Sequence, residues 1–490
     1  MPQINEKLTG ILARRGIKWN AVNLICSKGL AISSRLLLAQ IIAPDYFGLI
    51  SMVLVFQGLI GILIDFGLQG ALIQRRRDSH TAIRYHTAFW VLCTGGVAWW
   101  ALYIFLGVPL MSTLFQDDRV LGVALLIAPC ILFQSISLVP EIILTRRLKF
   151  DAIAKAEITA SVGSSFIAVS SAFLGAGIYA LIIQHIIYHG VRALAVFRAS
   201  KWSPRMRFHF QSIREVMSFS CFMLGSRVLY FIRTNQDTIL IGAFLGAAPL
   251  GVYSMAYTLT ENVRTQIARI ISRVMLPIYG RMQDEPSRIG VHYLSITRAM
   301  TLAFFPISLT LIFFGRVIIE GLFPDEWLAA IVPTKLLALG GVVYAVSGPA
   351  AEVFQGIGRV KELFKISLIN VVLIGLPLML ALVYLFGING AAGAMFISFV
   401  SMRIMSYYAM RRYVDVSVSQ ILLAISPSLT ATAIAVCINY VLGLNSTPFG
   451  IITIWVSFAT AAFLVYLDLA IRLISSIPNR ESRGKLDRRD

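Results

Sequence analysis

Long apolar runs separated by short polar segments make up most of the chain. Windows of about 19 residues read for hydropathy predict fourteen helices, each close to the roughly 20 residues that one bilayer crossing needs. The predicted helices cover residues 17–42, 46–70, 87–108, 120–140, 157–175, 178–197, 216–235, 238–262, 291–315, 328–350, 364–386, 389–410, 420–442 and 449–472. The pattern therefore predicts an all-α polytopic membrane protein.

The composition supports this class and excludes two others. Of the 490 residues, 57% are hydrophobic and 14% are charged, whereas an ordinary soluble protein carries about 25% charged residues. Too few polar groups remain to cover a water-facing surface, which excludes a soluble enzyme with a single anchor. A disordered scaffold is excluded as well, because the apolar content is too high for disorder.

The positive charge is distributed as in a membrane protein. The formal net charge of +19 could suggest a nucleic-acid partner, but the basic residues come in bursts between apolar runs, such as Arg75–Arg77 and the tail after residue 473. They concentrate before the first predicted helix and after each even-numbered one, while the alternate loops carry Arg119 and Arg316. Because the basic side of a membrane protein faces inward, we expect both termini in the cytoplasm, membrane lipids as partners and no nucleic acid.

The residues that usually bind metals or cofactors do not form a recognisable site. All five cysteines lie inside apolar stretches without a CxxC pair, so neither a disulfide nor a zinc site is predicted. His185, His189 and Arg192 share a face of the helix predicted at 178–197, which we interpret as an interhelical polar contact because further metal ligands are lacking. No GxxxxGK[ST] motif occurs, so direct use of ATP is not expected. The sequence predicts no cofactor, no metal and no catalytic residues.

Three motifs recur in order along the chain. Phe47–Met52 returns as Leu250–Met255, Leu114–Asp118 as Leu322–Glu326, and Arg147–Lys149 as Arg359–Lys361, at separations of about 203, 208 and 212 residues. This indicates a duplicated unit of six helices. Since six is even, the copies face the same way, as parallel repeats do.

The repeat predicts a domain organisation. Two six-helix lobes, 17–200 and 216–412, should surround a central cavity and be joined by a cytoplasmic linker at 201–215. Rocking of one lobe on the other would give alternating access. Outside the repeat lie a cytoplasmic N-terminus (1–16), two further helices (420–472) and a basic cytoplasmic tail (473–490).

Several segments together resemble a known transporter family. They are Pro44–Gly48, Asp65–Leu68, Ala71–Gln74, Arg146–Phe150, Leu250–Tyr257 and Ser272–Pro277. In these segments, and from about residue 15 to 410, the chain resembles the Wzx-type polysaccharide flippases of the multidrug/oligosaccharidyl-lipid/polysaccharide exporter superfamily. The resemblance implies a protein of the bacterial inner membrane that moves an undecaprenyl-diphosphate-linked oligosaccharide repeat unit outward for exopolysaccharide or lipopolysaccharide biosynthesis. It also implies a polysaccharide polymerase and a chain-length regulator as partners.

Four cations inside predicted spans are candidate ligands for such a diphosphate. An ionisable residue at mid-span costs at least about 2.5–3.5 kcal/mol and so calls for a reason. Lys28 and Arg35, seven apart, share a face of the first helix, and Arg227 and Arg233 lie on the corresponding helix of the second copy. Arg and Lys bind phosphate by charge-assisted hydrogen bonds, so we predict a ring of these four residues around the diphosphate. Snorkelling to the interface or ion pairing is the alternative role.

Other charges near the helix ends have weaker assignments. Asp65, Asp237 and Glu261 are candidates for coupling or gating, although Asp65 could equally pair with the region of Arg75–Arg77, and Asp237 with Arg233 four residues earlier. Three arginines at the inner end of the eighth helix could admit the substrate from the cytoplasmic leaflet or simply attract anionic lipid: Arg264, Arg269 and Arg273.

Two further kinds of function fit the pattern less well. A multidrug cation antiporter of the same superfamily should carry carboxylates in its cleft, whereas the charge within the spans here is mainly basic. A membrane-embedded glycosyltransferase or polymer ligase would use exterior carboxylates, but Asp117–Asp118 and Asp325–Glu326 both precede an apolar helix, where N-caps belong. As a driving force, the membrane potential would favour outward movement of two negative charges by about 4–5 kcal/mol per 100 mV, and cation antiport is the other scheme.

Overall fold

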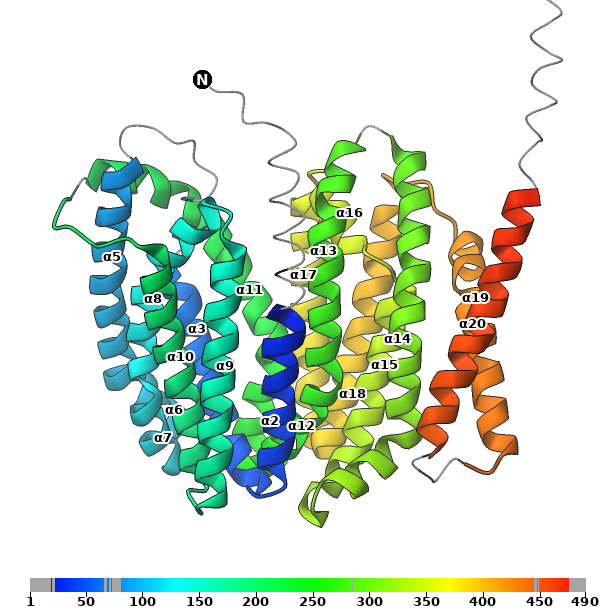
Figure 1. Ribbon diagram of the computed structural model, residues 1–490, viewed down its shortest axis with the longest axis horizontal. Helices are drawn as coiled ribbons and strands as arrows, with labels where there is room; N and C mark the ends of the chain where they lie inside the picture. Colours follow the sequence, from blue (N-terminus) through cyan, green and yellow to red (C-terminus); the bar gives the residue numbers. More distant parts are fainter. Residues whose placement is uncertain are drawn as a thin grey trace, which may run out of the picture. The chain divides into compact units, whose positions relative to one another are not determined.

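The computed structural model describes residues 19, 23–65, 68–69, 72, 81–208, 210–283, 285–444, 447 and 449–475. These residues form helices joined by short turns, and no strand occurs among them (Figure 1). The predicted all-α class is confirmed.

The described helices group into two compact units that interleave along the chain. The first comprises the residues up to Thr258 together with Leu322–Pro333 and Leu368–Met395. Its elements are η1 (Leu24–Lys28), α2 (Gly29–Ala39), α3 (Pro44–Asp65), α5 (Thr81–Leu102), η2 (Tyr103–Gly107), α6 (Val108–Phe115), α7 (Arg119–Ile127), α8 (Pro129–Arg146), α9 (Phe150–Phe173), α10 (Ile178–Ser200), α11 (Phe210–Leu245), α12 (Ala247–Tyr257), η4 (Asp325–Ala330), η5 (Asn370–Gly375) and the first part of α18 (Leu376–Met410). In Figure 1, α8, α9 and α10 run side by side, and α10 packs on both of the others.

The second unit comprises Leu259–Gly321, Thr334–Ser367 and the residues from Phe396 onward. Its elements are η3 (Thr258–Asn262), α13 (Val263–Arg281), α14 (Pro286–Leu322), α15 (Ile331–Val346), α16 (Ala350–Gly356), α17 (Val360–Ile369), the rest of α18, α19 (Val418–Val441) and α20 (Phe449–Ser475). Helices α19 and α20 pack on each other (Figure 1). The lobe boundaries derived from the repeat stay a prediction, since these units do not divide the chain at one point.

Every predicted span overlaps a helix, although the count of fourteen stays a prediction. In the described part of the chain, nine helical segments are long and apolar enough to cross a membrane, and Phe449–Phe463 forms a shorter apolar helix. The break predicted between 386 and 389 is confirmed: α18 has a kink at Gly387, whose φ is 58°. A positive φ costs glycine little because it has no Cβ.

The break predicted between 235 and 238 is wrong. Helix α11 continues to Leu245 and ends at Gly246, whose φ is 82°. Asp237 lies at the predicted break, and its buried carboxylate accepts hydrogen bonds from the Tyr253 hydroxyl (2.9 Å) and the Thr238 amide (2.8 Å). Because a buried polar group that is hydrogen-bonded loses little stability, the helix tolerates the aspartate in its interior.

The first pair of repeated motifs forms a close helix crossing within the first unit. Gly48 in α3 and Gly251 in α12 are the equivalent glycines of the two copies, and each faces the backbone of the other helix. A Cβ on Gly48 would lie 1.8 Å from the Ala247 carbonyl oxygen, and a Cβ on Gly251 would lie 1.8 Å from that of Pro44. Small residues allow membrane helices to approach this closely, so both glycines are required by packing.

Hydrogen bonds and ion pairs between charged side chains stabilise the turn before α7. Asp117 accepts hydrogen bonds from the Arg119 backbone amide (3.0 Å) and guanidinium (2.7 Å), and the same guanidinium binds Asp45 at the start of α3. The hydrogen bond from Arg119 lowers the pKa of Asp117 below its ordinary value. The N-cap residue of α7 is Asp118, which makes no side-chain capping hydrogen bond, so the predicted N-cap role is wrong for this residue, and Asp117 instead satisfies the amide of the first residue of the helix. Asp118 accepts instead from the Ser112 hydroxyl (2.7 Å), and Asp325 and Glu326 lie in the first turn of η4.

Candidate functional site

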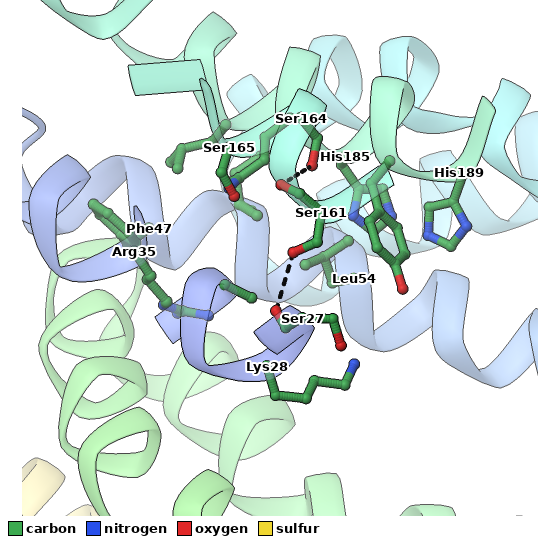
Figure 2. Close-up of a pocket in the computed structure, with 15 residues that line it drawn as sticks. Ser27, Lys28, Arg35, Phe47, Leu54, Ser161, Ser164, Ser165, His185 and His189 are labelled. Atoms are coloured by element: carbon green, nitrogen blue, oxygen red, sulfur yellow. Dashed lines mark hydrogen bonds between the residues drawn. The ribbon is translucent and has the colours of Figure 1, made fainter. Parts of the chain in front are cut away.

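A cavity of about 280 Å³ lies in the first unit, lined by residues of η1, α2, α3, α9 and α10. Figure 2 shows its walls: Lys28 and Arg35 from the first two elements, a group of serines from α9, and two histidines from α10. Two of the four cations predicted to bind a diphosphate therefore line one cavity.

Arg35 is held in place without using all of its donors. Its Nη2 donates a hydrogen bond to the Ser254 hydroxyl of α12 (3.0 Å), and its guanidinium lies 5.5 Å from the centre of the Phe47 ring. Its Nε is buried and has no hydrogen-bond partner. A buried donor that lacks an acceptor costs about 1–3 kcal/mol, which an anion in the cavity would recover.

Lys28 closes another part of the cavity. It is the last residue of η1, a π-helical turn that leads directly into α2. Single π-turns within α-helices frequently occur at functional sites because they change which face a side chain occupies. Figure 2 shows the Lys28 amine extending along the cavity next to Ser27, so the side chain brings a positive charge to this wall.

Hydroxyl and amide groups form the wall contributed by α9 and α10. Ser161 donates to the Ser27 carbonyl oxygen (3.0 Å) and Ser164 to the Ser161 carbonyl oxygen (3.2 Å), as the dashed lines in Figure 2 mark. The Gln184 amide donates to the Ser34 hydroxyl (3.0 Å). Each hydroxyl oxygen keeps acceptor capacity, so this wall can bind the hydroxyl groups of a ligand.

The two histidines of α10 lie side by side in Figure 2. Their ring centres are 4.6 Å apart, and His185 Nε2 lies 2.8 Å from Gln57 Oε1 of α3. This confirms the predicted interhelical polar contact. One turn further along α10, Arg192 binds Glu141 of α8 (2.8 Å) and Glu157 of α9 (3.5 Å). No cluster of three or more potential metal ligands occurs among the described residues.

The other two predicted diphosphate ligands do not line this cavity. Arg227 in α11 forms an ion pair with Asp65 at the end of α3, and the Asp65 carboxylate also accepts from the Gln69 amide (2.9 Å). Arg233 lies 5.2 Å from the centre of the Tyr230 ring. Arg75–Arg77, the alternative partners predicted for Asp65, lie outside the described residues.

Glu261 and Arg264 form a buried ion pair in the second unit. Arg264 Nε lies 2.9 Å from both carboxylate oxygens of Glu261, and its guanidinium is 4.7 Å and 4.8 Å from the ring centres of Tyr344 and Phe399. The Glu261 side chain is 1% exposed. Arg269 and Arg273 belong to α13, but their side chains lie outside the described part of the structure.

Sequence reasoning did not identify the polar wall of the cavity. The signal that could have found it is a stripe of small residues on one face of an otherwise apolar helix, at Ser161, Ser164, Ser165 and Ala168. The spacing of three and four is helical, and all four are buried. Assigning this stripe to a cavity requires knowing that α9 packs against α2, which the pattern does not contain.

Comparison with known proteins gives a family and a fold. A family model described as "Polysaccharide biosynthesis protein" matches residues 37–333. The teichuronic acid biosynthesis protein TuaB of Bacillus subtilis is 27% identical over 367 residues, which are 74% of this chain and 74% of the relative. The lipopolysaccharide biosynthesis protein WzxC of Escherichia coli is 24% identical over 364 residues, 72% of this chain and 71% of the relative.

Two kinds of solved structure share the fold. The lipid II flippase MurJ in an inward closed conformation superposes with a TM-score of 0.75 at 15% identity, over 93% of this chain and 99% of MurJ. An inward-facing multidrug resistance transporter of the MATE family has a TM-score of 0.63 at 12% identity, over 81% of this chain and 97% of its own. Identities this low establish the fold alone.

Proposed function

Because this chain belongs to the family of polysaccharide biosynthesis proteins, we propose that it translocates an undecaprenyl-diphosphate-linked oligosaccharide repeat unit outward across the bacterial inner membrane, by alternating access. The resemblance stated from sequence is confirmed at the level of the family. The names of the relatives support the proposal, since one is a teichuronic acid biosynthesis protein and the other a lipopolysaccharide biosynthesis protein. MurJ, which shares the fold, is named as a flippase of lipid II.

The observation that carries the proposal is the charge of the cavity. Lys28 and Arg35 line it, and the Nε of Arg35 lacks an acceptor. A diphosphate offers several acceptor oxygens and negative charge, and hydrogen bonds in which both partners are charged are roughly twice as strong as neutral ones. The hydroxyl wall of α9 would then face the first sugar of the repeat unit.

The same charge argues against the alternative within transport. A multidrug cation antiporter fits the shared fold, but a cationic drug in this cavity would meet Lys28 and Arg35. Like charges in a low-dielectric environment repel by several kcal/mol. A glycosyltransferase or polymer ligase is disfavoured because the exterior acidic pair at Asp117–Asp118 is engaged in holding the turn before α7. We therefore propose a carrier without a catalytic step.

For the other residues that the sequence singled out, we propose the roles that the sequence predicted. Arg227 and Arg233 would complete the diphosphate ring in another state of the transport cycle. Three arginines would form the cytoplasmic entrance, namely Arg264, Arg269 and Arg273, and three acidic residues would serve coupling or gating, namely Asp65, Asp237 and Glu261. We place both termini in the cytoplasm and propose a polysaccharide polymerase and a chain-length regulator as partners.

A substitution of Lys28 tests the proposal. In proteoliposomes that contain a fluorescent short-chain isoprenyl-diphosphate sugar, we expect Lys28→Met to slow flipping about tenfold to a hundredfold. The reason is that a hydrogen bond to a charged group contributes about 1.5–3 kcal/mol. Flipping is measured as the fraction of label protected from a membrane-impermeant quencher.

Lys335→Met is the matched control. Lys335 lies half-buried in α15 of the second unit and is not among the residues that line the cavity. We expect this variant to flip at the wild-type rate. Full activity of Lys28→Met in protein that reconstitutes normally would contradict the proposed binding site.

A further inference from the structure

His185 and His189 line the same cavity as Lys28 and Arg35. Both rings are half-buried, and the Tyr188 ring packs edge-on against His189 at 5.3 Å between centres. The proposed function makes no use of the two imidazoles. Histidine is the side chain whose ordinary pKa lies near neutral pH, so the pair is a candidate for taking up a proton when a ligand binds.

The charges around the pair come from the elements that pack on α10 and from α10 itself. Lys28 of η1 and Arg192 of α10 act electrostatically on His189, Arg35 of α2 lines the cavity, and α3 contributes the neutral Gln57. The carboxylates are Glu141 of α8 and Glu157 of α9, and both bind Arg192. Within the described residues, neither imidazole forms an ion pair with a carboxylate. Positive charge therefore lies near the two rings, and no described carboxylate contacts them.

A bound diphosphate would reverse this electrostatic balance. In a cavity of about 280 Å³, a ligand of that charge lies close to every wall, and an opposite charge within about 4–6 Å favours the protonated imidazole. If the anion favours the proton, the proton favours the anion to the same extent, because binding linkage is reciprocal. The two histidines can therefore change the affinity of the cavity with pH.

We propose that His185 and His189 form a proton-accepting subsite, so that the cavity binds the diphosphate of the lipid-linked sugar together with a proton. This inference rests on the proposed function and adds to it the chemistry of coupling. The proton comes from the bulk solution, where the conjugate acid of the buffer releases it, and it is taken up by a ring nitrogen of the pair. The ligand then moves with a smaller net charge than the diphosphate carries alone.

Calorimetry on the purified full-length chain measures this proton directly. The probe is geranyl-diphosphate glucose, a diphosphate diester that does not titrate near neutral pH. Its binding heat is recorded at one pH in two buffers that differ in ionisation enthalpy, and the difference gives the protons taken up per ligand. We expect uptake between about pH 6 and 8, and a loss of affinity of up to tenfold for each unit rise in pH.

Substitutions assign the proton to the pair. In His185→Gln/His189→Gln we expect binding without proton uptake and with an affinity that is nearly independent of pH, while each single substitution retains part of the uptake. His292→Gln in α14 of the second unit is the matched control and should behave as wild type. Thermal unfolding reports whether each variant is folded.

The possible outcomes separate the two proposals. Binding that depends on Lys28 but takes up no proton in the wild type would overturn the proton-accepting subsite and leave the proposed function intact. The subsite is overturned in the same way if the double variant is folded and takes up protons as the wild type does. A complete absence of probe binding to the wild type would overturn both. The wild-type measurement needs no variant, so a misfolded double variant does not prevent the test.

Discussion

At the scale of single residues, Arg227 has both a predicted ligand role and an observed partner. Its guanidinium binds the Asp65 carboxylate, whose side chain is 8% exposed, while the Arg227 side chain is 36% exposed. Removing the arginine would take a charged donor from a nearly buried carboxylate that also accepts from the Gln69 amide. An ion pair of this kind can stabilise the contact between α3 and α11 without touching any substrate.

Exchange of the two charges tests which role applies. We expect Arg227→Gln to destabilise the protein by about 1–3 kcal/mol, because a buried charged acceptor loses its partner. The double variant Asp65→Arg/Arg227→Asp should regain most of that stability, as the pair re-forms with its polarity reversed. Thermal unfolding measures the stability and the proteoliposome assay measures flipping. If stability returns but flipping does not, Arg227 contacts the substrate, as the ring hypothesis predicts.

The partners of a residue could be predicted from the sequence only where those partners lie close to it along the chain. Lys28 and Arg35 are seven apart in one helix, so their common face follows from helix geometry alone, and both line the cavity. The pairing of Asp65 with Arg227 joins positions 162 apart. Nothing in the local pattern distinguishes it from a pairing with Arg75–Arg77, which is nearer in sequence.

At the scale of elements, the crossing of α3 and α12 explains why the first repeated motif is kept in both copies. Gly48 and Gly251 each lie against a backbone carbonyl of the opposite helix. The absence of a side chain at each glycine leaves room for the backbone of the other helix. The motif is therefore a packing feature, whatever its part in transport.

Alanine at either glycine should separate the two helices. A Cβ there would overlap backbone atoms, which cannot rotate away, and overpacking of this kind typically costs about 1–3 kcal/mol. We expect Gly48→Ala and Gly251→Ala each to lower the thermal unfolding temperature of the detergent-solubilised protein.

The control for this prediction is Gly122→Ala in α7. A Cβ at Gly122 meets nothing within 4 Å, and alanine is the better helix former by about 0.5–1 kcal/mol. This variant should be as stable as the wild type or slightly more stable. Equal stability of Gly48→Ala and Gly122→Ala would show that the crossing is looser than the structure indicates.

The helices themselves were largely predictable, and their ends were less so. Apolar periodicity and length located a helix at each predicted span, whereas the break predicted between 235 and 238 was misplaced, and the residue there, Asp237, lies inside α11. Its partner Tyr253 lies beyond the turn in α12, so the stabilising hydrogen bond exists only after the two helices pack. The π-turn of η1 was also invisible to hydropathy, since one additional residue per turn hardly alters an average over 19 positions.

At the scale of the whole molecule, the charge that crosses the membrane sets how strongly the potential drives export. A diphosphate diester alone carries two negative charges, and uptake of one proton would leave one. Each charge corresponds to about 2.3 kcal/mol per 100 mV. The proton-accepting subsite would thus halve the influence of the potential and add an influence of the pH gradient.

Leaflet distribution at a fixed potential distinguishes one charge from two. With a potassium diffusion potential of about 100 mV across proteoliposomes, one charge shifts the equilibrium ratio of the lipid-linked probe about fifty-fold and two charges shift it about two-thousand-fold. We expect the wild type to lie near the smaller value. His185→Gln/His189→Gln should lie near the larger one. A shift of about two-thousand-fold in both proteins would contradict co-movement of a proton.

The arrangement of helices in space was less accessible from sequence than their number and type. The repeat predicted two successive lobes, a division that stays a prediction, but it did not indicate that α11 and α12 pack on α3 within the first compact unit. Repeats identify which helices correspond, but the contact partners of each helix depend on side-chain complementarity over long sequence separations. The site on α9 and α10 was missed for the same reason.

The π-turn at η1 has a consequence for tolerance to insertions and deletions. Asn23 donates a hydrogen bond to Glu157, and Lys28, five positions later, lines the cavity. In regular α-helix these positions would diverge by about 140° around the axis, whereas the i→i+5 bonding of a π-turn stacks them. Deleting one residue between Asn23 and Lys28 would restore a regular α-helix and leave the two four positions apart, about 40° around the axis. They would still share a side, so a single deletion in this stretch should preserve both the fold and the position of the lysine in the cavity.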